Sequence, residues 1–440
     1  MNNKKWMAIL LGGIMAASLA APCSVSAAEK TTLTFWHAMG GTNGEVLQQI
    51  VDDFNASQDE IEVKAEYQGT YDDTITKLKA ALQSDSGLPD VCQMYDVGTK
   101  FMYDSGAVIP VEDKFESTGY DKSSVMEVIS SYYTVDGKQY AMPFNVSTPM
   151  LYYNKDVFEA AGLDPETPPT TYDEVLEDAK KIVESGAAPV GYSQAIYGWF
   201  FEQQLAGLGV TYGNNDNGRK EAVTAVDFDS NGGGLKVFDM WKKLYDSGCF
   251  EDYGTTTADT QTAFFSGQVG MIIESTAILK NAVDSSPFEV GTGYLPRIEQ
   301  NDEGGVIIGG GSLWLTDTGN EANEDAAWKF IEYITTPDVQ AKWSMGTGYF
   351  AINEKAYETD DMKAYLEENP NFETAINQLK DSPVNCNTAG VLSGVQTEAR
   401  LTFNEIMPQV YDGKLTTQNA VDQLAASVNK AIENYNESIK

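Results

Sequence analysis

Apolar residues near the start of the chain recur with strand-like and helix-like spacings in turn. They alternate with polar residues over 32–36 and again over 61–67, which is typical of half-buried strands. Between and after these strands, apolar residues recur at helical spacing over 46–54 and 75–82. A further apolar run at 91–95 completes a strand–helix–strand–helix–strand order. This alternation predicts a largely parallel sheet with helices on both faces.

The same α/β pattern returns later in the chain. Residues 150–153 have the pattern of a strand, and residues 171–174 (TYDE) form a capping box that opens a helix ending at Gly186. The chain closes with a long amphipathic helix that starts at Thr416 or Thr417. No Pro- or Ser-rich linker separates the two halves, so we expect several hinge strands to join them.

The predicted architecture is therefore α/β, with two lobes that face each other across a cleft. Each lobe is expected to be a mostly parallel sheet flanked by helices. We assign residues 28–145 and 310–345 to the first lobe, and residues 146–309 and 346–440 to the second. In open α/β sheets, ligands bind beyond the carboxyl ends of the strands. The residues that follow each strand are therefore the first candidates for a binding site.

Residues 1–27 have the features of an export signal. Two lysines are followed by an apolar run over 8–20 and by small residues at 25–28, where a signal peptidase would cleave. The apolar run is too short to span a bilayer, which needs about 20 residues. We expect an exported, soluble, periplasmic protein. Cys23 offers a lipid anchor as the alternative, but Pro22 stands where lipoprotein signals have a small residue, so plain cleavage is favoured.

The composition excludes several classes of function. Of the 440 residues, 42% are hydrophobic, which is enough for a large folded core. Acidic residues outnumber basic ones 65 to 29, whereas a nucleic-acid binder needs the opposite balance, so we expect no nucleic-acid partner. The only histidine is His37, and the four cysteines form no C-x-x-C pair. We therefore expect no metal site, no cofactor and no catalytic triad.

Aromatic or acidic residues follow three successive predicted strands. They lie in the segments 36–39 (WHAM), 69–72 (GTYD) and 95–98 (YDVG). Aromatic faces stack on sugars and polyols, and carboxylates accept hydrogen bonds from hydroxyl groups. Each residue alone is explained as well by core packing or by a helix start. Their common placement after strands favours a binding site at the cleft.

Three further features bear on a ligand site. Residues 145–149 form a polar stretch at the join of the two halves, which a satisfied turn would explain equally well. Residues 307–312 combine a strand with three glycines that let a ligand approach the backbone, and they lack the lysine of a nucleotide P-loop. Arg400 is one of only three arginines and is suited to paired contacts. Arg219 follows the polar segment 214–218, so we expect it on the solvated surface.

At these residues the chain resembles the extracellular solute-binding proteins of ABC importers, the family that includes maltose-binding protein. Within that family it is most similar to the members that bind sn-glycerol-3-phosphate. The resemblance covers essentially the whole mature chain. It is carried by residues 35–39, 69–71, 93–98, 142–155, 161–165, 308–314 and 347–349, and by Arg400.

The resemblance implies the two-lobed type II periplasmic-binding-protein fold and a set of ligand contacts. Those contacts are Tyr71, Asp96, Ser147, Ser275, Gly310, Tyr349 and Arg400, with Trp36 and Trp199 as stacking surfaces. It also implies a monomer that delivers its small polar ligand to an ABC permease and ATPase in the membrane, without any enzymatic step.

Two departures from the family pattern concern the ligand. Asp96 stands where the family usually has glutamate, which keeps the charge on a shorter side chain. Ile196 replaces the first tryptophan of a Trp-x-x-Trp arrangement whose second member is Trp199. The loss of one stacking face widens the pocket. A larger glycerophosphodiester such as glycerophosphocholine therefore joins sn-glycerol-3-phosphate as an expected ligand.

The expected function is capture of sn-glycerol-3-phosphate or a glycerophosphodiester by hinge closure, for delivery to the permease. In this scheme Asp96 and Tyr71 contact the glycerol hydroxyls from one lobe and Arg400 contributes from the other. The alternative is a binding protein for neutral sugars or oligosaccharides, because Trp36, Trp199 and Tyr349 would stack on them equally well. A secreted glycosidase with paired carboxylates is a more distant alternative, since 65 acidic residues always supply some pair.

Overall fold

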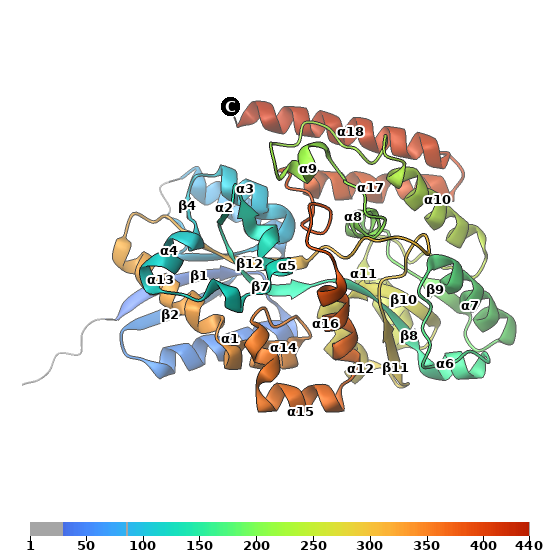
Figure 1. Cartoon of the computed structure of the whole chain (residues 1–440), viewed down its shortest axis with the longest axis horizontal. Helices are drawn as coiled ribbons and strands as arrows, with labels where there is room; N and C mark the ends of the chain where they lie inside the picture. The colour runs from blue at the N-terminus through green and yellow to red at the C-terminus, as the bar shows by residue number, and fades with distance from the viewer. Residues whose placement is uncertain (1–29, 85–86, 440) are drawn as a thin grey trace, which may run out of the picture.

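A computed structural model describes residues 30–84 and 87–439, so the predicted export signal and Cys23 lie outside the described residues. The N-terminal strand–helix alternation forms a six-stranded sheet in the order β2-β1-β3-β12-β4, with β7 also paired to β12 (Figure 1). These strands are β1 (Thr31–His37), β2 (Ile61–Tyr67), β3 (Val91–Tyr95), β4 (Val108–Ile109), β7 (Met142–Ser147) and β12 (Gly309–Thr316). As predicted, β1 runs parallel to β2 and β3. Strand β12 is antiparallel to β3, β4 and β7.

Helices cover this first sheet. The predicted apolar stripe of α1 is buried, and α2 begins with a capping box between Thr70 and Asp73. Helix α1 already begins at Gly41, within the glycine-rich segment that precedes the apolar stripe. The helices, with two short strands, are α1 (Gly41–Ser57), α2 (Tyr71–Leu82), η1 (Asp96–Gly98), α3 (Thr99–Asp104), α4 (Val111–Thr118), η2 (Lys122–Ser124), α5 (Glu127–Ser130), η3 (Ser131–Tyr133), β5 (Thr134–Val135), β6 (Lys138–Gln139), α13 (Glu321–Ile334), α14 (Pro337–Thr347), η5 (Glu354–Glu358) and α15 (Asp360–Glu368).

The second sheet has four strands in the order β11-β8-β10-β9. They are β8 (Pro149–Asn154), β9 (Val190–Ser193), β10 (Val269–Ser275) and β11 (Val290–Gly293). Only β9 and β10 are parallel, whereas β8 is antiparallel to both of its neighbours. The prediction of a mostly parallel sheet is therefore wrong for this half, and it holds only for the β2-β1-β3 part of the first sheet, where β12 makes three antiparallel pairs. Strand β8 follows β7 after the single residue Thr148, so no crossover helix imposes a parallel direction on it.

The helices of the second half flank this sheet. Helix α7 begins after Thr171, whose capping box with Glu174 is present, and it ends at Gly186 with φ 74°, as predicted. Helix α18 is capped by Thr416. The helices are α6 (Lys155–Ala160), α7 (Tyr172–Ser185), α8 (Gly198–Gly207), α9 (Asn214–Gly218), α10 (Gly233–Asp246), α11 (Thr257–Phe265), η4 (Thr276–Ile278), α12 (Leu279–Ser285), α16 (Asn371–Asp381), α17 (Gln396–Tyr411) and α18 (Thr417–Ser438).

Two apolar cores meet at the second sheet. Alternate residues of β8 point to opposite faces, so Met150 and Tyr152 join the core of the first sheet while Leu151 and Tyr153 join the core of the second half. Figure 1 shows the two halves side by side, with β7 and β8 running from one into the other. The chain crosses again between β11 and β12, and once more between α15, which packs on α14, and α16, which packs on β11. None of the helices within the described residues combines the length and the apolar character that a membrane span requires.

Candidate functional site

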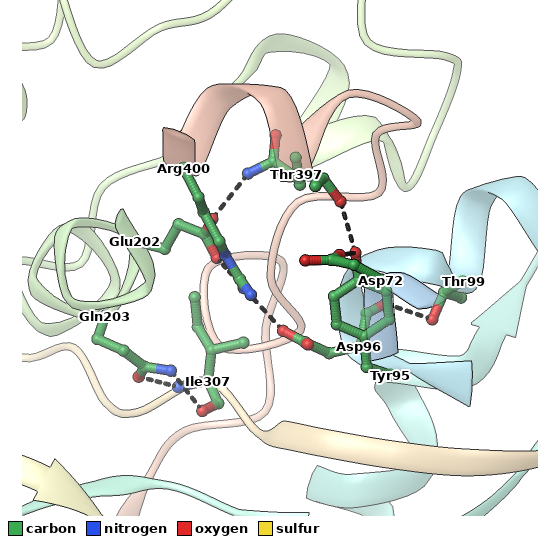
Figure 2. Close-up of polar contacts among 10 residues, drawn as sticks. Asp72, Tyr95, Asp96, Thr99, Glu202, Gln203, Ile307, Thr397 and Arg400 are labelled. Atoms are coloured by element: carbon green, nitrogen blue, oxygen red, sulfur yellow. Dashed lines mark hydrogen bonds and ion pairs between the residues drawn. The ribbon is translucent and has the colours of Figure 1, made fainter. Parts of the chain in front are cut away.

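The guanidinium of Arg400 lies between two carboxylates that come from different helices. Its Nη2 atom donates to Oδ2 of Asp96 and to Oε2 of Glu202, both at 2.7 Å, and its Nε atom donates to Oε1 of Glu202 at 2.8 Å (Figure 2). The three side chains are 7–8% exposed. Gln396 adds a hydrogen bond to Oε1 of Glu202 at 3.0 Å. One positively charged and two negatively charged groups are thus buried in contact with one another.

The fold explains how these three residues meet. Asp96 follows β3 directly, at the carboxyl end of the strand, where the sequence predicts it. Glu202 lies in α8, whose other residues from 198 to 206 are also buried. Arg400 lies in the first turns of α17, which packs against α8. Burial raises the pKa of Glu202, and the positive charge of Arg400 opposes that rise. Burial lowers the pKa of Arg400, but the two carboxylates outweigh it and hold that pKa well above its ordinary value.

A second group of polar residues lies next to Asp96. The side-chain amide of Asn145 donates to the hydroxyl of Tyr71 at 2.7 Å and accepts from Gln93 at 2.6 Å. The ring of Tyr71 stacks on that of Tyr95, with centroids 5.1 Å apart and planes at 9°. Tyr95 precedes Asp96 in the chain, and its hydroxyl reaches across to Thr397 on α17 at 2.6 Å. Tyr71 and Asp96 are therefore brought together by Asn145 and Tyr95.

The glycines at the start of β12 lie against this polar group. Gly310 has φ 90°, and a Cβ atom at this position would lie 1.8 Å from the backbone oxygen of Asn145. A Cβ atom at Gly309 would lie 2.8 Å from the ring of Trp199. Gly309 also pairs with Ser147 at the end of β7. The sequence predicts that these glycines let a ligand approach the backbone. Asn145 and Trp199 occupy that space here, and a larger residue at either glycine would not fit.

The contacts close into a ring. Trp199 is preceded by Gly198, where a Cβ atom would lie 2.5 Å from Cα of Arg400. Contacts and chain neighbours connect Arg400, Gly198, Trp199, Gly309, Gly310, Asn145, Tyr71, Tyr95 and Asp96 in this order and lead back to Arg400, and Ser147 joins them by pairing with Gly309. We call these ten residues the site ring.

Tyr349 lies beside the ring. Its aromatic ring stacks on Trp343 at 5.6 Å, and the backbone of Phe350 hydrogen-bonds to that of Val146. Burial raises the pKa of Tyr349, which hydrogen bonding with Asn145 and Tyr71 partly offsets. Tyr349 therefore belongs with Tyr71 and Asn145.

Two predicted residues lie apart from the ring. The Nε1 atom of Trp36 donates to Oε2 of Glu66 at 3.1 Å, on the exposed part of the β1–β2 pair. Ser275 ends β10, and its hydroxyl caps η4 by accepting from the backbone of Ala277 at 3.1 Å. Ser275 is connected to the site through β8, because β10 pairs with β8 and β8 follows β7, which ends at Ser147.

Arg219 is not on the solvated surface, and that prediction is wrong. Its guanidinium donates hydrogen bonds to the backbone oxygens of Tyr132, Ala389 and Gly390, and it lies 5.3 Å from the ring centroid of Tyr132. Residues 215–217 have φ between 55° and 58°, and this left-handed turn directs the chain toward the contact. The polar composition of the segment gives no sign of this turn.

Several members of the site were not predicted. Glu202 is the main partner of Arg400, and its one signal in the sequence is a charged residue within an apolar helix. Gln93 lies within β3, whereas Tyr95 and Asn145 belong to the segments 95–98 and 145–149 that the sequence singled out without assigning a role to either residue. Cavities of about 580 and 750 Å³ lie elsewhere, the first beside α16 and the second around Arg219, and neither is lined by a ring residue.

The chemistry of the ring suits binding. The ring offers the carboxylate of Asp96, hydroxyls, an amide and aromatic faces, and Glu202 adds a second carboxylate beside it; these are the groups that recognise hydroxylated ligands. Within residues 30–84 and 87–439, no group of three or more histidine, cysteine or acidic side chains is arranged to hold a metal ion.

Comparison with known proteins identifies the family. The family model described as bacterial extracellular solute-binding protein matches residues 49–374. The sn-glycerol-3-phosphate-binding periplasmic protein UgpB of Escherichia coli (strain K12) is 31% identical over 417 residues, which cover 93% of this chain and 94% of that protein.

Solved structures agree on the fold. UgpB from Mycobacterium tuberculosis in complex with glycerophosphocholine has a TM-score of 0.79 at 20% identity, and covers 93% of this chain and 100% of that one. The cyclic α-maltosyl-1,6-maltose binding protein from Arthrobacter globiformis has a TM-score of 0.76 at 26% identity, with 92% and 100% covered. The predicted two-lobed α/β architecture is confirmed. The chain belongs to the bacterial extracellular solute-binding proteins, the non-enzymatic binding components of ABC importers, and it is similar to UgpB.

Proposed function

We propose that this solute-binding protein captures sn-glycerol-3-phosphate or a glycerophosphodiester for its ABC importer. The observation that supports this ligand class is the 31% identity to a glycerol-3-phosphate-binding protein over 93% of the chain. The site ring is compatible with it, because hydroxyl, amide and carboxylate groups converge there. Asp96 and Tyr71 would contact the glycerol hydroxyls, while Ser147, Ser275, Tyr349 and the backbone near Gly310 would hold the phosphate.

Capture would proceed by closure of the two lobes. Asp96 and Tyr71 begin helices that follow strands of the first sheet, whereas Arg400 and Trp199 come from helices of the second half. A ligand that contacts both sides stabilises the closed arrangement in proportion to the contacts that exist only there. We propose moving lobes of residues 28–145 with 310–345 and residues 146–309 with 346–440. The packing of α15 on α14 argues for moving the last boundary to the end of α15.

The cellular setting follows from the same proposal. Residues 1–27 would direct export to the periplasm, where a monomer carries its ligand to the permease and ATPase. The relatives are periplasmic, as their names state. Lipid attachment at Cys23 is the alternative, and the mass of the mature protein distinguishes the two.

A neutral sugar or oligosaccharide is the second candidate ligand. The 26% identity to a maltosyl-maltose binding protein supports it, as do the aromatic rings of Trp199 and Tyr349 at the site. Thermal unfolding of ligand-stripped protein tests both candidates, since a ligand that binds only the folded state raises Tm. We expect sn-glycerol-3-phosphate or a glycerophosphodiester to raise Tm. An increase with maltose alone would favour the sugar.

A variant connects such a shift to the site. Tyr71→Phe removes the hydroxyl that Asn145 contacts, so the ligand-induced increase in Tm should shrink. Tyr253→Phe is the matched control, because that half-buried tyrosine lies outside the ring. An equal loss in both variants would contradict the proposed site.

A further inference from the structure

The charged groups of the site ring and of Glu202, which contacts the ring through Arg400, do not balance. Arg400 supplies one positive charge, whereas Asp96 and Glu202 supply two negative charges. Both oxygens of Glu202 accept hydrogen bonds from N–H groups of Arg400, and Gln396 donates a third, which is the environment of an ionised carboxylate. The buried triad therefore carries a net charge of −1. Asp72, which accepts from the hydroxyl of Tyr95 at 3.0 Å, adds negative charge beside it.

No second cation compensates for this charge. Among the hydrogen bonds and ion pairs of the described residues, Arg400 is the only positively charged group that contacts a ring residue. Lys100 is paired with Asp104, and Arg219 is bound to backbone oxygens. The donors that remain for an anion are neutral. One of them, Nε1 of Trp199, is buried without a hydrogen-bond partner within the described part of the chain.

We propose that the site selects phosphate ligands by charge and that Glu202 is the residue that sets this selectivity. The inference rests on the proposed function and narrows its ligand class. A phosphodiester carries one negative charge, whereas a phosphate monoester at neutral pH carries nearly two. Neutral donors stabilise a monoanion, but the second charge of a monoester is repelled by the triad. The diester is therefore the preferred ligand.

The size of the preference follows from Coulomb's law. One additional like charge several ångströms from a buried charge, at the effective dielectric constant of a protein site, weakens binding by roughly tenfold to a hundredfold. This estimate applies to the arrangement of this structure, in which Arg400 donates to Asp96 and Glu202 and not to a ligand.

Calorimetric titration at pH 7.5 tests the inference through the ratio of two dissociation constants. The ligands are sn-glycerol-3-phosphate and glycerophosphoglycerol, a diester whose second alcohol is neutral. We expect the monoester to bind at least tenfold more weakly than the diester in the wild type. Glu202→Gln should reduce that ratio severalfold. Glu398→Gln, which removes the same charge from an exposed position on the helix of Arg400, should leave it unchanged.

A second titration series uses only the wild type, so its result does not depend on whether a variant folds. Lowering the pH from 7.5 to 5.5 protonates the monoester, whose second pKa is about 6, and leaves the diester unchanged. His37 stays uncharged over this range because burial lowers its pKa to about 4. The carboxylates of Asp72, Asp96 and Glu202 face Arg400 and Tyr95 from three elements. The ratio should therefore approach one at pH 5.5.

The outcomes separate the two proposals. Binding of neither ligand overturns the proposed function together with this inference. Binding of both ligands with the monoester equal or tighter at pH 7.5, or with a ratio that neither Glu202→Gln nor pH changes, overturns the charge selectivity alone.

Discussion

Nη2 of Arg400 lies 2.7 Å from Oδ2 of Asp96, and this ion pair joins two residues 304 positions apart in the chain. Asp96 directly follows β3 of the first sheet, whereas Arg400 lies in a helix of the second half. The pair therefore connects the two halves. Tyr95, which precedes Asp96, makes a second contact between the halves, a hydrogen bond with Thr397. In the proposed closure, this pair would form as the two halves come together.

Removal of Arg400 should destabilise the fold as well as the site. In Arg400→Ala, Asp96 and Glu202 remain buried without a partner, and such an uncompensated charge costs about 3–5 kcal/mol. Urea unfolding measures the loss. Lys430→Ala breaks the exposed pair with Glu433 at 2.7 Å and should change stability little, because solvent screens this pair. Equal stability losses in the two variants would contradict the buried charge triad.

A methyl group at Gly310 should displace the backbone at the site. Its φ of 90° disfavours any other residue, and the added Cβ would lie 1.8 Å from the Asn145 oxygen. We expect Gly310→Ala to lose about 3 kcal/mol of stability and to weaken ligand binding. Gly319 has φ 70° and open space around it. Gly319→Ala is therefore the control that measures the cost of the backbone conformation alone, about 1 kcal/mol. Unaltered ligand binding by Gly310→Ala would contradict the role of the glycine.

A contact away from the site should also influence affinity. The hydroxyl of Tyr435 on α18 donates to Oδ2 of Asp104 on α3 at 2.6 Å, and Asp104 is also paired with Lys100. Because α3 and α18 belong to opposite halves, Tyr435→Phe should reduce the population of the closed state. The apparent dissociation constant should rise roughly threefold to tenfold. Tyr67→Phe, at a tyrosine that is 58% exposed, is the control, and an equal effect there would refute the interpretation.

The single histidine should make stability depend on pH. Burial lowers the pKa of His37 from 6.5 to about 4, so the folded protein binds the proton less readily than the unfolded chain. The resulting contribution is fully present above pH 6.5 and is lost as the pH falls from 6.5 toward 4. It amounts to about 1–3 kcal/mol. Unfolding at pH 7.5 and pH 5 should show this loss in the wild type. It should be smaller in His37→Gln, where an amide oxygen can still accept from Met39.

Local features of the fold could be predicted from the sequence, because their causes are local. The capping box of Thr171 and Glu174, the end of α7 at Gly186 and the buried stripe of α1 depend on residues within a few positions of one another. The antiparallel direction of β8 depends instead on how the chain leaves the first sheet. Nothing in residues 149–154 encodes that direction.

The site could be predicted only in part. Strand ends and family resemblance point to Tyr71, Asp96 and Arg400, which lie together. Glu202 was missed because its partner lies 198 residues further along and no local pattern connects them. Trp36, like Tyr71, was selected for its place at the end of a predicted strand. Its side chain instead contacts Glu66, because sequence alone does not give the direction of a side chain.

Isothermal titration of ligand-stripped protein with sn-glycerol-3-phosphate, glycerophosphocholine and maltose tests the central claim most directly. We expect saturable binding of at least one glycerophosphate compound, lost in Arg400→Ala at a temperature where that variant is folded. Saturable binding of maltose, with no heat from either phosphate compound, would contradict the proposed ligand and assign the protein to sugar import.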